Sequence, residues 1–135
     1  MGGCSNYRDG LYDWIMIKDN HVDASGGIRQ AIEQVHEYLA NNHLDLGITV
    51  EVRNFEEMNE VLEVGGITRI MLDNFTVEDM RRAVKIINQR FEVEASGGIT
   101  LETVRPIAET GVDFISSGAL THSYQSLDLS LKIIK

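Results

Sequence analysis

Five apolar runs recur along the chain, and each ends abruptly in a polar or glycine-containing corner. The first run, Trp14 to Ile17, is followed at once by Lys-Asp-Asn-His. Each step between corners has the length of a strand, a helix and two loops, which predicts a parallel sheet with right-handed crossovers. The corners stand, in steps of 33, 22, 23 and 21 residues, at Lys18, Glu51, Asp73, Ser96 and Ser117.

Strands are predicted at the apolar runs, over residues 14–17, 48–52, 69–72, 91–95 and 113–116. Between them, apolar residues at helical spacing predict helices over 25–42 and 101–110 and behind the N-caps Asn54 and Thr76. Glu57, three residues after Asn54, makes a variant of the capping box. Pro106 is tolerated if its helix begins late.

Two architectures fit this order, an open doubly wound sheet and part of a (β/α) barrel. The barrel is favoured, because five successive strands each end in a candidate ligand and barrel strand ends converge on one axis. Closing eight strands takes about 200 residues or more, and this chain has 135. We therefore expect an incomplete barrel-type sheet over residues 1–125, whose edges and inner face are covered by other chain, by another subunit or by an unusual arrangement.

Residues 127–133 depart from the helical pattern. Leucine and isoleucine alternate there with Asp128, Ser130 and Lys132, a period of two that predicts a half-buried strand with an antiparallel partner. We therefore assign residues 126–135 to a separate C-terminal strand.

The net charge and the composition limit the classes of partner that this chain can bind. The formal net charge is −9, which argues against nucleic acid or an anionic membrane surface, because both need clustered Lys and Arg. No apolar run approaches the roughly 20 residues of a membrane span, and the N-terminus lacks a signal-peptide pattern. The single cysteine, Cys4, fits a reducing compartment, so we expect a cytoplasmic location.

Two late corners combine hydroxyls with glycine. Ser96-Gly97-Gly98 and Ser116-Ser117-Gly118 both allow a close backbone approach to an anion, and a helix N-terminus follows each. Two such corners on adjacent strands are typical of barrel phosphate sites. Either corner alone is better explained as a helix cap, and only the adjacent pair makes phosphate binding an equal alternative.

Three charged corners form a second candidate set. Glu51 and Asp73 could hold Mg²⁺ or ribose hydroxyls, and Lys18 beside them could bind a carboxylate or phosphate. The alternative is a structural ring of salt bridges at the barrel mouth. Arg8 has a donor fork suited to a planar carboxylate, whereas His21 and His122 are each more typical of capping or supporting groups.

Six segments, taken together and in order, resemble the C-terminal half of quinolinate phosphoribosyltransferase, also called carboxylating nicotinate-nucleotide pyrophosphorylase. The resemblance covers nearly the whole chain and implies a barrel whose C-terminal strand lacks its usual partner sheet. The matching segments are GGCSNYR at 2–8, IKDNH at 17–21, VEV at 50–52, MLDN at 71–74, EASGGI at 94–99 and SGALTHS at 117–123.

The resemblance implies a glycosyltransferase of NAD biosynthesis. It would transfer a phosphoribosyl group from phosphoribosyl pyrophosphate to quinolinate with Mg²⁺, and release pyrophosphate and carbon dioxide to give nicotinate mononucleotide. Arg8 and Lys18 would bind the quinolinate carboxylates, and Tyr7 would line that pocket. Glu51 and Asp73 would address the ribose and the metal, and with Lys18 they form the expected catalytic set. The 5′-phosphate would lie against Ser96, Gly97, Gly98 and Gly118, close to His122.

This sequence also departs from the family. Tyr7 stands where the family usually has His, and Cys4 where it usually has Gly. The family's N-terminal domain, first barrel strands and a basic segment are not among these 135 residues, and a partner subunit completes the family's site, which implies a dimer or larger homo-oligomer. We therefore expect little or no turnover from the isolated chain. The alternatives are a non-catalytic truncated barrel or fragment that self-associates, and a related transferase acting on another acid.

Overall fold

The computed structural model describes residues 3–123, 127 and 129–134. Its centre is one sheet in which five strands pair in sequence order, each parallel to the next. Every predicted strand of the sheet is present, and no strand end differs from its predicted position by more than one residue. The strands are β1 (Ile15–Ile17), β2 (Ile48–Val52), β3 (Arg69–Asp73), β4 (Glu92–Ser96) and β5 (Phe114–Ile115).

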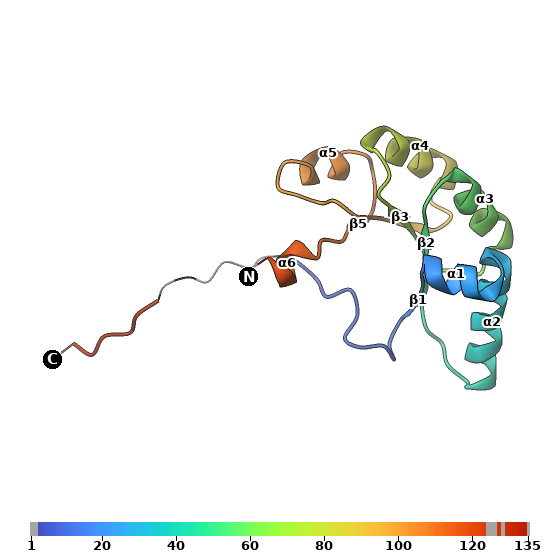
Figure 1. The fold of residues 1–135 in the computed structure, drawn as a ribbon, viewed down its shortest axis with the longest axis horizontal. Coiled ribbons are helices and arrows are strands. Elements are labelled where there is room, and N and C mark those ends of the chain that lie inside the picture. The colour runs from blue at the N-terminus through green and yellow to red at the C-terminus, as the bar shows by residue number, and fades with distance from the viewer. Residues whose placement is uncertain (1–2, 124–126, 128, 135) are drawn as a thin grey trace.

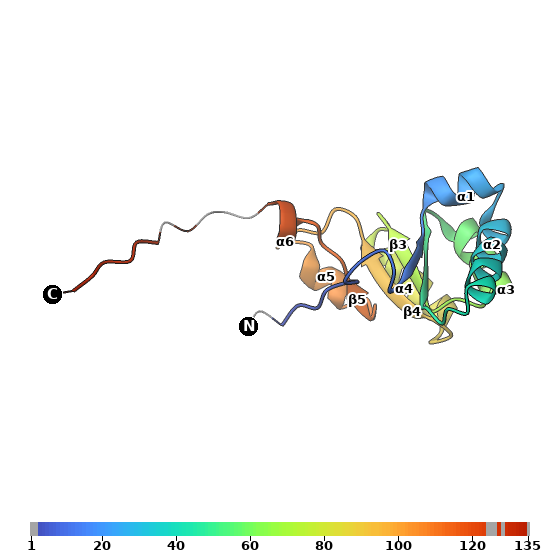
Figure 2. The same cartoon turned by 90° about the horizontal axis from the view of Figure 1, so that it is seen from below.

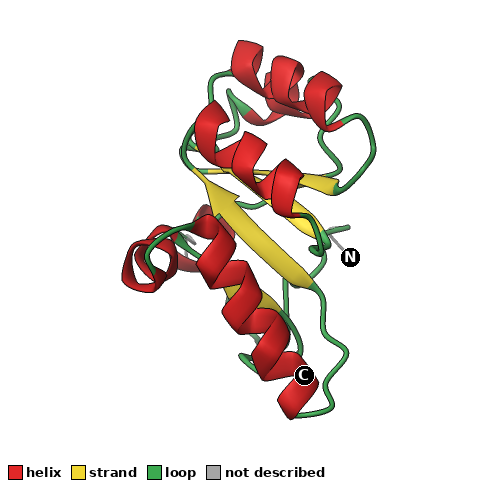
Figure 3. Ribbon diagram, turned by 90° about the vertical axis from the view of Figure 1, so that its right-hand side faces the viewer, coloured by secondary structure: helices red, strands yellow, loops and turns green. Residues whose placement is uncertain are grey.

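The helices follow the strands along the convex side of the sheet (Figure 1). Figure 3 shows them stacked next to one another in front of the strands. They are α1 (Asp19–Ser25), α2 (Ile28–Asn41), α3 (Phe55–Val64), α4 (Val77–Ile87) and α5 (Val104–Ala108). A further short helix, α6 (Ala119–His122), follows β5.

The strand order decides between the two predicted architectures. A doubly wound sheet reverses its order at one point and carries helices on both faces. Here the order β1-β2-β3-β4-β5 never reverses, and right-handed crossovers that all run one way place the helices on one side. The N-terminal segment and α6 lie on the opposite, concave side (Figure 1). The incomplete barrel-type sheet is therefore confirmed.

The two faces of the central strands differ in chemistry. Val50, Val52, Ile70 and Leu72 are fully buried and join one apolar core with helix residues such as Met58. Because side chains alternate along a strand, the intervening positions face the concave side. These positions are mostly polar, and include Thr49, Glu51, Arg69, Asp73 and Glu94.

Both predicted N-caps are confirmed. The backbone N–H of Glu57 donates to Asn54 Oδ1 at 2.9 Å, and that of Asp79 donates to Thr76 Oγ1 at 3.1 Å. The Glu57 carboxylate accepts from the backbone N–H of Arg53 at 2.7 Å, one residue before the position that a standard capping box uses.

Two helices differ from their predicted bounds. The helix expected over 25–42 is α2 alone, and a separate α1 precedes it, because Gly26 and Gly27 take φ values of 88° and 141° that no continuous helix allows. The helix expected over 101–110 shortens to α5. Pro106 is the third residue of α5, where its missing N–H would have no helical acceptor in any case.

The predicted C-terminal strand is absent from the described part of the tail, residues 127 and 129–134. These residues extend away from the sheet (Figure 2), and their leucine and isoleucine side chains are 80–98% exposed. An extended segment becomes a strand only when a neighbour accepts its backbone hydrogen bonds, and no described residue of this chain does so. Residues 126, 128 and 135 of the predicted strand lie outside the described residues.

Candidate functional site

An open cleft of about 1150 Å³ lies on the concave side of the sheet. Its volume lies above the roughly 300–1,000 Å³ that is typical of a pocket for one small ligand. It gathers every predicted site residue except Arg8. The predicted residues in its lining are Tyr7, Lys18, Glu51, Asp73, Ser96, Gly97, Gly98, Gly118 and His122.

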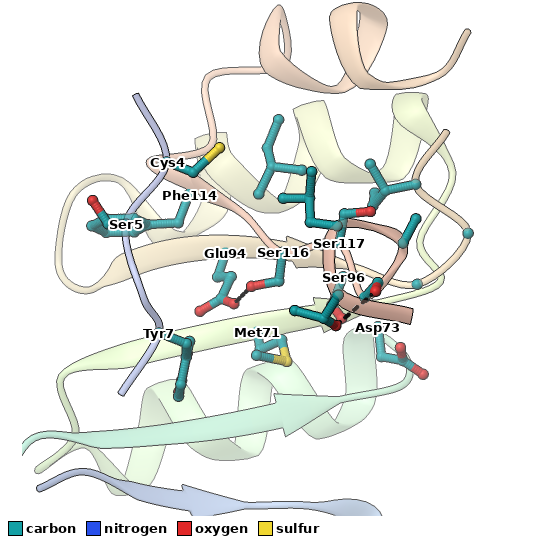
Figure 4. A pocket seen from close by; sticks show the side chains of 18 of the residues that line it. Cys4, Ser5, Tyr7, Met71, Asp73, Glu94, Ser96, Phe114, Ser116 and Ser117 are labelled. Carbon is teal, nitrogen blue, oxygen red and sulfur yellow. Dashed lines mark hydrogen bonds between the residues drawn. The ribbon is translucent and has the colours of Figure 1, made fainter. Parts of the chain in front are cut away.

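Arg8 lies outside this lining. Its Nη1 donates to the backbone carbonyl of Trp14 at 3.2 Å, which turns the guanidinium toward the start of β1. Its neighbour Tyr7 faces the concave surface of the sheet instead (Figure 4). The structure therefore brings one of these two predicted acid-binding residues into the cleft.

Lys18 and Glu51 meet at the ends of β1 and β2. Lys18 Nζ lies 3.8 Å from Glu51 Oε2, and the Lys18 side chain is 54% exposed whereas that of Glu51 is 13% exposed. Burial raises the pKa of Glu51, Asp73 raises it further by repulsion, and Lys18 opposes both effects. His21 caps the helix start here, since its Nδ1 accepts from the Lys18 backbone N–H at 3.0 Å.

The corner after β4 needs its glycines. Ser96 is paired with Asp73 of β3, and its carbonyl accepts from Asn74 N at 2.9 Å. Gly97 has φ +86°, and a Cβ there would collide with the Asn74 side chain. Helix α5 begins only at Val104, so the N–H groups nearest this corner belong to the turn before the helix.

The corner after β5 leads directly into α6. Gly118 precedes this helix, and a Cβ at Gly118 would press against the imidazole of His122. The His122 ring therefore folds back over the corner, where Nδ1 lies 2.9 Å from Ser123 Oγ. Ser96, Ser117 and Gly118 line the same end of the cleft, so the two corners face one space.

Sequence reasoning did not predict the buried ionic cluster at the base of the cleft. Glu94 is fully buried and accepts from Arg69 Nη1 at 3.0 Å and from the Ser116 hydroxyl (Figure 4). Arg69 also pairs with Glu92 at 2.8 Å. Its guanidinium carbon lies 3.8 Å from the centroid of the Phe114 ring. The sequence does contain a signal for this cluster, because charged residues stand at alternate positions of the otherwise apolar strands β3 and β4.

The sequence and the fold of this chain resemble those of known proteins. A family model described as the quinolinate phosphoribosyl transferase C-terminal domain matches residues 1–132. The chain belongs to this family. The resemblance predicted from the six sequence segments is thereby confirmed.

Curated relatives and solved structures agree with the family assignment. The chain is 51% identical to the chloroplastic carboxylating nicotinate-nucleotide pyrophosphorylase of Arabidopsis thaliana and 50% identical to a mitochondrial quinolinate phosphoribosyltransferase of Nicotiana glauca. Each alignment covers 98% of this chain and 42% of the relative. The crystal structure of NadC from Streptococcus pyogenes superposes with a TM-score of 0.86 at 38% identity, over 97% of this chain and 45% of that one. The chain thus spans about two-fifths of its relatives' length.

Two further properties bear on ligands and location. Among the described residues, no group of three or more His, Cys, Asp or Glu side chains is arranged to hold a metal ion by itself. No helix in the same residues has the length and apolar character that crossing a bilayer requires.

Proposed function

We propose that this chain carries the substrate-contacting strand ends of a quinolinate phosphoribosyltransferase of NAD biosynthesis. The reaction transfers phosphoribosyl from phosphoribosyl pyrophosphate to quinolinate and gives nicotinate mononucleotide, pyrophosphate and carbon dioxide. One observation carries the proposal. The ends of successive parallel strands place a lysine, two carboxylates and two serine-glycine corners around one cleft of about 1150 Å³.

The geometry supports a division of this cleft into two ends. The exposed ammonium of Lys18 supplies the charge that a quinolinate carboxylate requires. The Ser96-Gly97-Gly98 turn and Gly118 offer backbone N–H groups and hydroxyls to the 5′-phosphate, with His122 beside them. The ribose then lies between these ends, next to Glu51 and Asp73.

This placement accounts for the chemistry of the transfer. The bond from the anomeric carbon to a pyrophosphate oxygen breaks, its electron pair leaves with pyrophosphate, and the pyridine nitrogen forms the new bond. Positive charge develops on the ribose ring during this exchange, and the Glu51 and Asp73 carboxylates stabilise it. The carboxylate next to the ring nitrogen leaves as carbon dioxide, and a proton replaces it on the ring.

Glu51 and Asp73 also fit a magnesium ion. Both offer hard carboxylate oxygens, and their mutual repulsion contributes to the raised pKa of Glu51, which a divalent cation would offset. Two carboxylates leave most positions of an octahedral ion to water and substrate phosphates. The ion would neutralise the pyrophosphate leaving group.

The concave side has an open edge at β1 and another at β5 within the described chain, which favours a larger assembly. We propose that the active form is a dimer or larger homo-oligomer in the cytoplasm, and that the isolated chain turns over weakly or not at all. With Arg8 turned toward Trp14, Lys18 and Arg69 are the only Lys or Arg side chains among the described residues that line the cleft, and Arg69 is already paired with two glutamates.

A second candidate function is a non-catalytic barrel fragment that self-associates. The exposed apolar side chains of Leu127, Leu129, Leu131 and Ile133 favour this alternative. Ligand binding distinguishes the two, because both allow assembly, which light scattering detects, whereas only the transferase requires saturable binding of quinolinate and phosphoribosyl pyrophosphate.

The test is a pair of measurements on the same protein. Calorimetric titration with quinolinate and, separately, with phosphoribosyl pyrophosphate and Mg²⁺ should give saturable binding that Lys18→Met and Asp73→Asn respectively weaken. Chromatographic detection of nicotinate mononucleotide measures turnover. Absence of binding by both ligands would refute the proposal, and turnover at a normal enzymatic rate would refute the predicted weakness of the isolated chain.

A further inference from the structure

Thr49 is a fully buried polar residue on the concave face of β2, two positions before Glu51. Its hydroxyl oxygen accepts two hydrogen bonds, from the Tyr7 hydroxyl at 2.6 Å and from Trp14 Nε1 at 2.8 Å. A threonine oxygen has two acceptor positions, so both are used. Neither donor comes from the sheet partners of Thr49, which are Met16 and Arg69.

These two bonds attach the N-terminal segment, residues 3–13, and the residue that follows it to β2. Tyr7 belongs to this segment, and Trp14 follows it directly before β1. The Tyr7 and Trp14 rings meet edge to face, with centroids 6.5 Å apart. The Arg69 guanidinium carbon lies 5.7 Å from the Tyr7 centroid and 5.3 Å from that of Trp14. Thr49 is therefore the polar anchor of an aromatic cluster from which Tyr7 and Arg69 line the cleft.

The Trp14 ring can lie over the start of β2 only because Gly47 has no side chain there. A Cβ at Gly47, two residues before Thr49, would collide with the Trp14 ring. Gly47 also accepts from the Ile15 backbone N–H at 2.9 Å, so the indole lies over the start of β2 where this glycine permits it. The indole N–H thereby reaches Thr49.

The direction of the Tyr7 hydrogen bond limits what Tyr7 can offer a ligand. Its only hydroxyl proton is directed to Thr49, and the oxygen that remains is an acceptor, which repels a carboxylate. Burial raises the pKa of Tyr7, which keeps this proton on the phenol at neutral pH. The ring of Tyr7 is the part available for contact with an aromatic acid.

We propose that Thr49 is a positioning residue for the acid substrate, which fixes Tyr7 so that its ring, and not its hydroxyl, packs against the pyridine. The inference rests on the proposed function for the identity of the acid. The attachment of the N-terminal segment by Thr49 does not depend on it.

The experiment uses the full chain and its single tryptophan, Trp14, as the reporter. Fluorescence titration with quinolinate is compared for the wild type, Thr49→Val, Thr49→Ser, Tyr7→Phe and the double variant of Thr49→Val with Tyr7→Phe. Thr110→Val is the matched control, because Thr110 is also a buried threonine outside the cleft lining, but its hydroxyl donates to Ile107 O and contacts no residue of the N-terminal segment. Hydrogen exchange of residues 3–13 is measured on each protein without ligand.

Thr49→Val removes the acceptor of both hydrogen bonds, and the loss of the Tyr7 bond should weaken quinolinate binding roughly 3- to 10-fold and speed exchange across residues 3–13. Tyr7→Phe keeps the Trp14 bond and should weaken binding by a similar or smaller factor, the double variant should be no worse than Thr49→Val, and Thr49→Ser should restore both readouts. Thr110→Val should change neither.

Unchanged exchange in Thr49→Val would overturn the positioning role, whatever the binding result. Faster exchange with wild-type affinity would overturn the link to the substrate. If the wild type itself binds no quinolinate, the proposed function and the identity of the acid fail, and the exchange data alone decide whether Thr49 fixes the segment.

Discussion

Arg69 Nη1 donates to Glu94 Oε2 at 3.0 Å, and the carboxylate that receives it is fully buried. Arg69 opens β3 and Glu94 lies in the middle of β4, so the pair joins two adjacent strands across the base of the cleft. The Ser116 hydroxyl shares the same carboxylate and connects β4 to the corner after β5. This ionic cluster therefore joins β3, β4 and the corner after β5 at the base of the cleft.

Removing the cation of this ionic cluster should strongly destabilise the folded chain. Arg69→Leu leaves Glu94 buried without its charge partner, and we expect a loss of about 3–5 kcal/mol in the free energy of unfolding, measured by urea denaturation. Arg105→Leu is the control, because the Arg105 side chain is 86% exposed in its pair with Glu109 and should change stability by less than about 1 kcal/mol. Adding Glu94→Gln to Arg69→Leu should recover part of the loss. Equal effects of Arg69→Leu and Arg105→Leu would contradict this assignment.

Glu51 should make stability depend on pH. Its pKa is raised in the folded chain, so the folded state favours the protonated acid. This contribution is fully present below the unfolded pKa of about 4.3 and is lost as pH rises through the folded pKa. Glu51→Gln should therefore raise the thermal midpoint at pH 7 relative to wild type, and the difference should shrink toward pH 4. Lys18→Met should lower the midpoint at pH 7, because Lys18 favours the ionised form. A Glu51→Gln midpoint below wild type at pH 7 would show that the pairing with Lys18 outweighs burial.

The Ser96-Gly97-Gly98 turn should be sensitive to a single methyl group. Gly97→Ala combines an unfavourable φ with a collision against Asn74, so we expect a loss of roughly 2–3 kcal/mol and weaker binding of phosphoribosyl pyrophosphate. Gly26→Ala is the control for φ alone, because Gly26 has φ +88° with open space around it, and it should cost about 1 kcal/mol. Chemical denaturation and calorimetry measure the two effects. If Asn74→Ala does not relieve part of the Gly97→Ala loss, the collision is not its cause.

The cap of α4 offers a measure of local helix stability. Thr76→Ala removes the acceptor of the Asp79 backbone N–H and should cost about 1 kcal/mol in urea denaturation. Thr76→Ser retains the acceptor and should cost much less. Equal losses in both variants would point to the methyl group of Thr76 and not to the cap.

The strands and the site residues at their ends were predictable because a short stretch of consecutive residues is enough to identify each of them. A lysine or carboxylate that ends an apolar run is visible in a few consecutive residues, as at Lys18 and Asp73. The two helix caps were equally local. Parallel strand ends then meet at one edge of the sheet, which brings residues distant in sequence together.

The remaining features depend on register and on neighbours. Arg69 meets Glu94, 25 residues away, only because of how β3 pairs with β4, and Thr49 meets Tyr7 across 42 residues. Arg8 matched a family motif, yet its guanidinium follows the local carbonyl of Trp14. The tail carried a strand pattern without a strand, because alternation predicts which face is apolar but does not supply a partner for the backbone.

The order of the strands also affects how the chain assembles. In the part of the chain that the structure describes, each strand after β1 pairs with the strand that precedes it in sequence, so none of these pairings waits for a distant segment. Loop closure between such neighbours costs less entropy than the long-range closures of Greek-key sheets, and proteins rich in local contacts fold faster. During synthesis, each new strand and helix can dock on the edge left by the unit before it, in the manner of a repeat protein. If the strands dock in the order β1 to β5, the cleft forms strand by strand, and the serine-glycine corners after β4 and β5 form last.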